Sequence, residues 1–209
     1  MTDLNPRQQA TAAIAAFTAI GRMPQLRDAL TGGLDAGLSV NQIKEILVQM
    51  YAYAGFPRSL NALGAFMALL EQRRADGITD PAGDQPRPLA AGTDMRKLGT
   101  DNQTRLSGAP VTGPLFEFAP AIDQFLKTHL FGDIFARDNL DWPSREIATV
   151  AALATLDGVE SQLQSHFGIA LNTGLTATHL RGLVTVVRDR VGHAQGDRAA
   201  GILDRVLAG

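Results

Sequence analysis

The 209-residue chain contains no cysteine, and this absence excludes several chemistries at once. Disulfide bonds, thiolate metal sites and thiol-based redox catalysis all require cysteine. Aromatic residues are also scarce, at 6% of the chain, and charged residues make up only 19%. Hydrophobic residues amount to 45%, a composition typical of a soluble globular protein.

Neither charge nor hydropathy indicates nucleic acid or membrane as a partner. The net charge is −2, and Lys and Arg are scattered along the chain. No apolar run approaches the roughly 20 residues that cross a bilayer. The apolar stretch Ala10–Ile20 lacks the basic cluster and cleavage site of a signal peptide. We therefore expect no nucleic-acid partner, no membrane association and a cytoplasmic location.

The chain contains two related copies of one segment, separated by 137 positions, the spacing from Gly37 to Gly174. Other matching pairs are Ala15 and Ala152, Thr18 and Thr155, Gly21 and Gly158, Gln25 and Gln162, Leu26 and Leu163, Leu34 and Leu171, Leu38 and Leu175, and Gly55 and Gly192. Repetition at a fixed spacing predicts two copies of one supersecondary unit.

The two copies differ at polar positions. His166 of the second copy corresponds to Ala29 of the first, and Glu146 corresponds to Gln9. The first copy instead carries the segment Tyr51–Arg58, which the second copy lacks. These differences predict one composite site rather than two identical sites.

The periodicity of apolar residues predicts an all-α fold, since no segment alternates with the period of a strand. Ser39 and Gln42 form a capping-box pattern that opens a helix at Val40–Tyr53. Gly55 ends this helix, and Pro57 suits the first turn of the next, which runs towards Arg74. Further helices are predicted at Ala119–Leu130, Arg145–Leu156 and Glu160–Asn172.

The segment Asp76–Gly113 is rich in Gly, Pro, Asp and Thr, which is typical of a linker or an extended arm. We therefore predict a first repeat at residues 1–75, a linker or arm at 76–113 and a second repeat at 114–209. The expected architecture is a bundle of two fused helical repeats with a long irregular connection.

Glu146 and His166 are the first candidate pair. Glu146 lies on the apolar stripe of its predicted helix, and His166 lies on the apolar face of the next. The tight turn at Gly158 should make these helices antiparallel and bring the two side chains together. A carboxylate beside an imidazole in a partly dry cavity is a usable acid–base pair. A purely structural hydrogen bond between two helices fits the same pattern.

The segment Tyr51–Asn61 is the second candidate. Because Tyr51 and Tyr53 are two positions apart, they cannot share a helix face, and only one should point into a given cavity. Arg58 would lie in the first turn of the following helix, with Asn61 one turn on. The planar guanidinium of Arg58 suits a substrate carboxylate, although it could equally pair with an acid of the protein.

Glu45, by contrast, lies opposite the apolar stripe of its helix. This placement predicts a solvated or interface position rather than a place in the site.

Several sequence blocks resemble the carboxymuconolactone decarboxylase family, part of the alkylhydroperoxidase D-like superfamily. They are Leu140–Glu146 with His166 and Ala170–Thr176, Asn41–Gln49 with Tyr51–Arg58, and the lead-in Asp133–Arg137. The resemblance covers nearly the whole chain except Asp76–Gly113. It implies an all-helical fold, a homo-oligomer, and chemistry without a metal or an organic cofactor.

The resemblance implies two known chemistries. One branch decarboxylates a carboxylated muconolactone in aromatic compound catabolism, and the other is a thiol peroxidase with a Cys-x-x-Cys pair assisted by a glutamate and a histidine. Those cysteines would align with Val159 and Gln162, and the assisting residues with Glu146 and His166. Without cysteine the thiol peroxidase mechanism cannot operate here.

The leading hypothesis is therefore a cofactor-independent, decarboxylase-type enzyme acting on a small carboxylated lactone or oxo acid. His166 would move the proton, Glu146 would orient it, and Arg58 would hold the substrate carboxylate, with Tyr51, Tyr53 and Asn61 as further binding residues. The alternative is a non-catalytic small-molecule-binding or assembly protein on the same fold.

Overall fold

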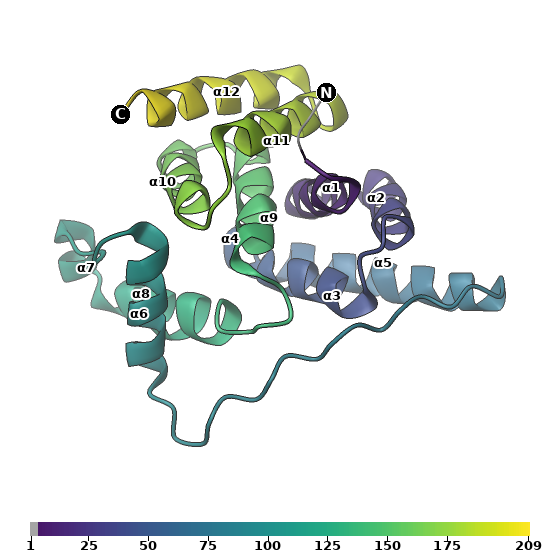
Figure 1. Ribbon diagram of the computed structural model, residues 1–209, viewed down its shortest axis with the longest axis horizontal. Helices are drawn as coiled ribbons and strands as arrows, with labels where there is room; N and C mark the ends of the chain where they lie inside the picture. The colour runs from purple at the N-terminus through teal and green to yellow at the C-terminus, as the bar shows by residue number, and fades with distance from the viewer. Residues whose placement is uncertain (1–3) are drawn as a thin grey trace.

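The computed structural model describes residues 4–209, and all of its regular structure is helical (Figure 1). The first repeat comprises α1 (Pro6–Ile20), α2 (Met23–Asp35), α3 (Val40–Gln49), α4 (Tyr51–Ala54) and α5 (Phe56–Ala75). The second contains α9 (Trp142–Thr155), α10 (Glu160–Asn172), α11 (Ala177–Arg190) and α12 (His193–Ala208). The all-α prediction is confirmed.

The helix bounds reproduce the internal repeat. Shifting α2 by the 137 positions gives α10 at both ends, and α5 and α12 begin at equivalent residues. Local signals act as predicted: Ser39 and Gln42 form a capping box at α3, and Gly55 has φ 83° between α4 and α5. The helix predicted at Val40–Tyr53 is divided at Met50 into α3 and α4.

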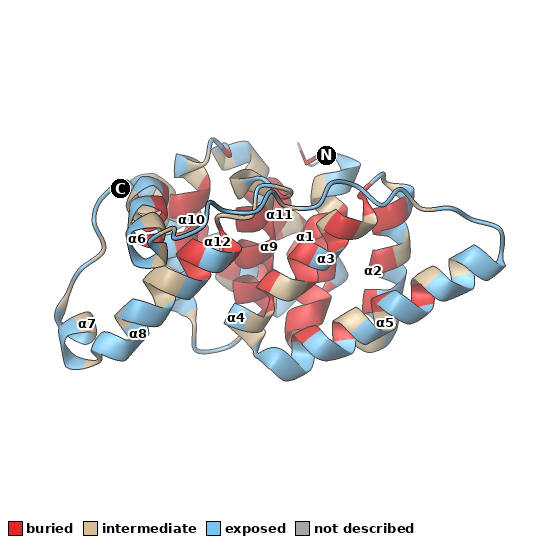
Figure 2. Cartoon of the chain, turned by 90° about the horizontal axis from the view of Figure 1, so that it is seen from below, coloured by how far each residue is buried: buried red, intermediate tan, exposed pale blue. Residues whose placement is uncertain are grey.

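The two repeats share one core. Helices α1 and α9, which occupy equivalent places in the two repeats, pack against each other at its centre, and both are almost fully buried (Figure 2). Alanines make up much of α1, including Ala12, Ala13, Ala15 and Ala16, so the two backbones can approach closely. This central pair fixes where the second-repeat site lies relative to the first repeat.

The connection between the repeats is only partly irregular. Residues 78–94 run as an arm across one side of the molecule, as Figures 1 and 2 show. The expectation of a linker over Asp76–Gly113 is wrong for α6 (Met95–Ser107), which Asp94 caps. Helix α6 packs against residues 126–134 in the first part of the second repeat, so tertiary contact stabilises a helix that its own sequence predicts poorly.

This first part of the second repeat also differs from the prediction of one helix over Ala119–Leu130. It consists of α7 (Pro114–Phe118), α8 (Pro120–Phe125) and the π-helix η1 (Leu126–Ile134). Leu130, Phe131 and Ile134 of η1 join Leu106 of α6 in a small second core against α10. This core forms one wall of the candidate site described below.

We predict that Gly99→Ala disrupts the packing of α6 on η1. A Cβ at Gly99 would lie 1.5 Å from the carbonyl oxygen of Lys127 and 2.9 Å from the backbone N of Gly132. Since backbone must move to admit it, we expect a loss of about 3 kcal/mol in the free energy of unfolding by urea denaturation.

Gly64→Ala in α5 is the matched control. A Cβ at Gly64 would meet nothing within 4 Å, so this variant should gain about 0.5–1 kcal/mol from helix propensity. Equal effects of the two substitutions would contradict the packing of α6 described here.

Candidate active site

Glu146 and His166 lie together between α9 and α10. The Nδ1 of His166 is 2.8 Å from Oε2 of Glu146. Glu146 has no exposed surface and His166 exposes 8%. With the Glu146 carboxylate accepting a hydrogen bond from Nδ1–H, the second ring nitrogen of a neutral His166, Nε2, is left as a proton acceptor.

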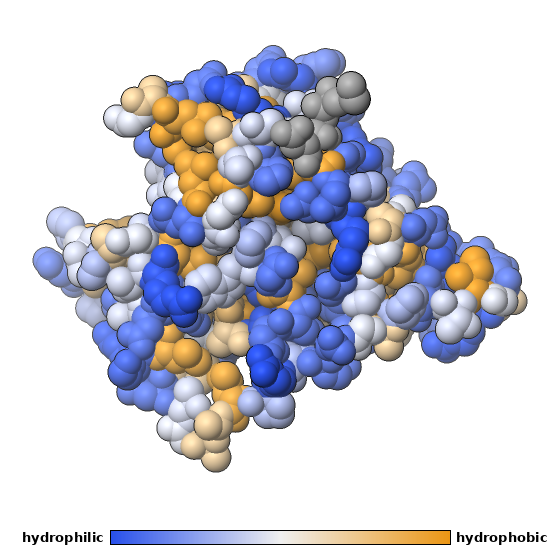
Figure 3. Space-filling view, viewed as in Figure 1, coloured by the Kyte–Doolittle hydropathy of each residue, from blue (hydrophilic) through white to orange (hydrophobic). Residues whose placement is uncertain are grey.

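His166 lines a cavity of about 720 Å³. Its walls come from α4, α6, η1, α10 and α12, and the lining is largely apolar, including Leu130, Phe131, Ile169 and Val206. The polar groups that line it are neutral amides and hydroxyls, Gln103, Gln162, Ser165 and Asn172 among them. On the face seen in Figure 3, apolar side chains gather over α10 and α12, near this cavity. Among the described residues that line this largely apolar cavity, the titratable side chains are His166 and Tyr53.

Tyr53 reaches the same cavity from α4 of the first repeat. Its ring meets the His166 imidazole edge-on, with centroids 5.6 Å apart. Burial raises the pKa of Tyr53, and the negative charge of Glu146 raises it further, outweighing the opposite effects of Thr149 and Arg145. Tyr53 thus stays protonated near neutral pH and keeps an O–H donor beside His166.

Two polar atoms of this site are buried without a hydrogen-bond partner among residues 4–209: the Tyr53 hydroxyl and Oε1 of Glu146. A buried polar atom without a partner is unfavourable by about 1–3 kcal/mol. Both atoms have almost no accessible surface, so they lie behind the wall of the cavity rather than in its open space.

The structure places the other predicted site residues elsewhere. Tyr51 stacks on Phe56 with ring centroids 4.3 Å apart and faces His129 rather than His166. Arg58 and Asn61 are exposed on α5 and do not line the cavity. The Arg58 guanidinium lies at the C-terminal end of α1, where a Cβ on Gly21 would be 1.4 Å from its Nη1. This end of α1 carries the negative pole of the helix dipole and attracts a cation.

The two positions that the resemblance described above aligns with a Cys-x-x-Cys pair lie in different surroundings. Gln162 lines the cavity close to His166, whereas Val159 packs against the main core. The place of a cysteine pair is thus taken by one amide and one apolar side chain.

Next to the site lies a buried charged network that the sequence analysis missed. Arg145 has no exposed surface and donates hydrogen bonds to Glu45 at 3.2 Å and to Gln49 at 3.0 Å. Arg137 also binds Glu45, through its Nη2 at 2.7 Å and its Nε. Of the solvated and interface positions expected for Glu45, the solvated one is wrong: Glu45 is 4% exposed because two arginines of the second half cover it.

The network reaches the candidate site through Gln49. The Gln49 amide donates to the carbonyl of Arg145 at 3.0 Å and to the Thr149 hydroxyl at 2.8 Å. Thr149 lies near the Tyr53 hydroxyl, whose pKa it lowers. Polar contacts therefore link the two repeats behind Tyr53 and Glu146.

The pH dependence of the free energy of unfolding should report the titration of the Glu45 carboxyl group. Burial alone would raise the pKa of Glu45, but the hydrogen bond from Arg137 and the charge of Arg145 outweigh it, so the pKa in the folded protein lies below the ordinary value of 4.5. A lowered folded pKa gives stability that is present above the unfolded pKa and is lost as the pH falls through the folded pKa.

We therefore expect the free energy of unfolding to fall steeply with acidification below pH 4.5, measured by urea denaturation between pH 3 and 7. In Glu45→Gln the slope below this pH should be shallower. Parallel profiles for the wild type and Glu45→Gln would show that Glu45 does not titrate in this way.

Residues 4–209 contain no group of three or more His, Cys, Asp or Glu side chains that could hold a metal ion. Over the same residues, no helix is long and apolar enough to cross a membrane.

Comparison with known families agrees with the geometry. Residues 2–68 and 120–205, well over half of the chain, match the profile described as the carboxymuconolactone decarboxylase family. The two matched regions correspond to the two repeats. The chain therefore belongs to the carboxymuconolactone decarboxylase family, as a two-repeat member without cysteine. No curated protein matches the chain.

Proposed function

We propose that the protein is a cofactor-independent acid–base enzyme of the decarboxylase type, acting on a small carboxylated lactone or oxo acid. His166 transfers the proton, Glu146 fixes its ring and tautomer, and Tyr53 forms part of the wall against which the substrate binds. The observation that carries the proposal is the His166–Glu146 hydrogen bond at 2.8 Å beside a cavity of about 720 Å³.

The reaction follows from these groups. The bond between the carboxylate carbon and its neighbour breaks, carbon dioxide leaves, and the electron pair moves onto the adjacent unsaturated system. Protonated His166 then delivers a proton to the carbon that has lost the carboxylate. Glu146 stabilises the imidazolium form and holds the ring in place.

The lining of the cavity supports loss of a carboxylate. Among the described residues that line it there is no Lys or Arg, so a bound carboxylate exchanges water for a largely apolar surrounding. Decarboxylation disperses that charge, and removal of water from around the carboxylate lowers the barrier to the reaction. Arg58 lies outside this cavity, so we assign it no role in binding the substrate within one chain.

A ligand screen by thermal shift tests the proposal. Small carboxylated lactones and oxo acids are added to the wild type, to His166→Ala and to His193→Ala, a histidine control at the start of α12. A bound ligand raises the melting temperature by mass action, so no assay of an unknown reaction is needed.

We expect stabilisation of the wild type and of His193→Ala, and its loss in His166→Ala. No stabilisation by any of these compounds would favour the non-catalytic binding or assembly protein instead.

We also propose that the chain forms a homo-oligomer through α5. Phe56, Leu60 and Met67 each expose 62% of their surface along one side of this helix. The equivalent positions of α12 are polar: His193, Asp197 and Asp204. Because polar residues at the equivalent positions of α12 are compatible with the same fold, Leu60 and Met67 are not required for packing within the repeat, whereas Phe56 stacks on Tyr51.

Light scattering should give a mass above the 22.2 kDa of one chain. The double variant Leu60→Asp with Met67→Asp should shift the protein towards the monomer, because buried carboxylates at the interface are unfavourable. Asp204→Asn on α12 is the control and should leave the mass unchanged. A wild-type monomer at micromolar concentration would contradict the oligomer.

A further inference from the structure

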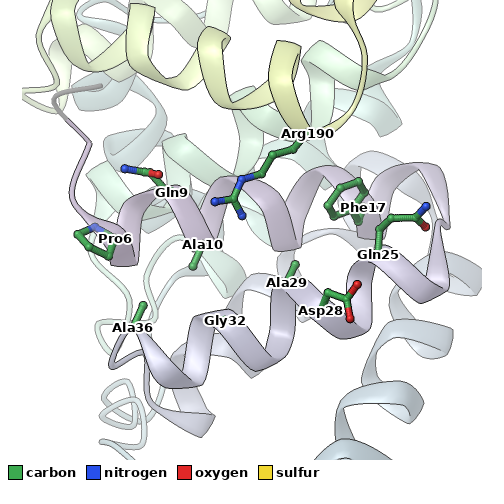
Figure 4. Close-up of a pocket in the computed structure, with 10 residues that line it drawn as sticks. All are labelled: Pro6, Gln9, Ala10, Phe17, Gln25, Asp28, Ala29, Gly32, Ala36 and Arg190. Atoms are coloured by element: carbon green, nitrogen blue, oxygen red, sulfur yellow. The ribbon is translucent and has the colours of Figure 1, made fainter. Parts of the chain in front are cut away.

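A second cavity, of about 510 Å³, lies in the first repeat between α1 and α2 (Figure 4). Gln25, Asp28, Ala29 and Gly32 of α2 form one wall. Arg190, the last residue of α11, extends towards α1 and forms part of the opposite wall (Figure 4).

The internal repeat relates this cavity to the one that contains His166. The four α2 positions named above correspond, at the 137-residue spacing, to Gln162, Ser165, His166 and Ile169 of α10, which all line the His166 cavity. Arg190 corresponds to Tyr53 at the same spacing. The two cavities therefore occupy the same place in the two repeats.

The first-repeat cavity lacks the acid–base pair. Ala29 stands where the second repeat has His166, and Gln9 stands in place of Glu146. The Gln9 amide donates to the carbonyl of Leu4 at 2.8 Å. A cavity is present in both repeats, but the residues described as lining this one include no imidazole that could transfer a proton. The first-repeat cavity is therefore suited to binding without catalysis.

The cationic side chain of Arg190 lines this cavity at the position where the neutral phenol of Tyr53 lines the His166 cavity. Arg190 makes no ion pair or hydrogen bond with the described residues other than the backbone bonds of its helix, so its guanidinium is available to a ligand. Asp28 lines the cavity too and is likewise unpaired within residues 4–209. Ala10, Phe17 and Ala29 supply apolar surface between the charged groups.

We propose that the first-repeat cavity is a second, non-catalytic binding site for a small carboxylate with an apolar body. The planar guanidinium of Arg190 binds the carboxylate through two parallel N–H donors, and the apolar body lies against Phe17 and Ala29. Asp28 opposes the negative charge and sets the affinity below what Arg190 alone would give. The site is separate from that of His166 and does not depend on catalysis there.

Backbone amide NMR of the full chain tests the proposal, with cyclohexanecarboxylate as the probe and cyclohexanecarboxamide as its uncharged control. We expect the carboxylate to shift the amide signals of Ala29 and Gly32 in a saturable way, and the carboxamide to shift them far less. His166→Ala should leave this titration unchanged, which separates the site from the other cavity.

Two surface variants make the test specific. Arg190→Gln should weaken binding by about tenfold, and Asp28→Asn should strengthen it by about threefold because a like charge is removed. The proposal is overturned if Ala29 and Gly32 do not respond to the carboxylate, or if Arg190→Gln and the wild type titrate alike.

Discussion

Arg145→Ala is expected to lower the free energy of unfolding by about 3–5 kcal/mol, the largest stability effect that we predict. Removing this guanidinium leaves Glu45 with Arg137 and the Asn139 amide as its donors and leaves the Gln49 amide oxygen without its donor at 3.0 Å. It also opens space in a fully buried place between the repeats. Urea denaturation at pH 7 measures the loss.

Arg137→Ala is the matched control, because it removes a second arginine from the same carboxylate. Its side chain is 40% exposed, so water replaces much of what is lost and the effect should be about 1 kcal/mol. The double variant Glu45→Leu with Arg145→Met should be more stable than Arg145→Ala, since it removes both buried charges and keeps volume. An Arg145→Ala protein as stable as the wild type would contradict the network.

His166→Ala is expected to lower kcat by about 10²–10⁴-fold on a substrate found in the ligand screen, the usual contribution of a positioned acid or base. Glu146→Gln should also lower kcat, but less, because the amide keeps a hydrogen-bonding group next to Nδ1 and loses only the charge. Tyr51→Phe is the control: Tyr51 contacts Phe56 and His129 and does not line the cavity, so kcat should stay within about twofold.

A structural role of the dyad would give a different pattern. Glu146→Gln and His166→Ala would then lower the melting temperature and leave kcat of the folded protein unchanged. Circular dichroism on the same samples separates loss of fold from loss of turnover.

The elements that the sequence predicts well are those encoded locally. The bounds of α10 are those predicted, and the capping box at Ser39 marks the start of α3. His166 and Glu146 could be paired beforehand because a short turn at Gly158 forces their helices to run antiparallel. In each case the determining residues lie within a few turns of one another.

The features that sequence reasoning missed depend on distant contacts. Glu45 is buried by Arg137 and Arg145, which are 92 and 100 positions away along the chain. No periodicity within α3 could reveal these partners, although an arginine directly before Glu146, in an apolar helix, was a signal. Helix α6 likewise depends on η1, where Gly99 allows contact between the two backbones.

The direction of a side chain was the least predictable feature of the site. Arg58 starts a helix as expected, yet it points to the end of α1 rather than to His166. Its partner is the dipole of a helix that ends more than thirty residues earlier in the sequence. Tyr53, in contrast, reaches His166 because α4 packs against α9.

Measuring the release of carbon dioxide tests most directly whether the His166 site decarboxylates its ligand. A ligand that stabilises the wild type but not His166→Ala is prepared with a ¹³C-labelled carboxylate and incubated with the wild type, with no cofactor added. We expect labelled bicarbonate to form in a molar amount many times that of the protein. A ligand that binds through His166 and remains unchanged would contradict it, and would show that the cavity binds small molecules without transforming them.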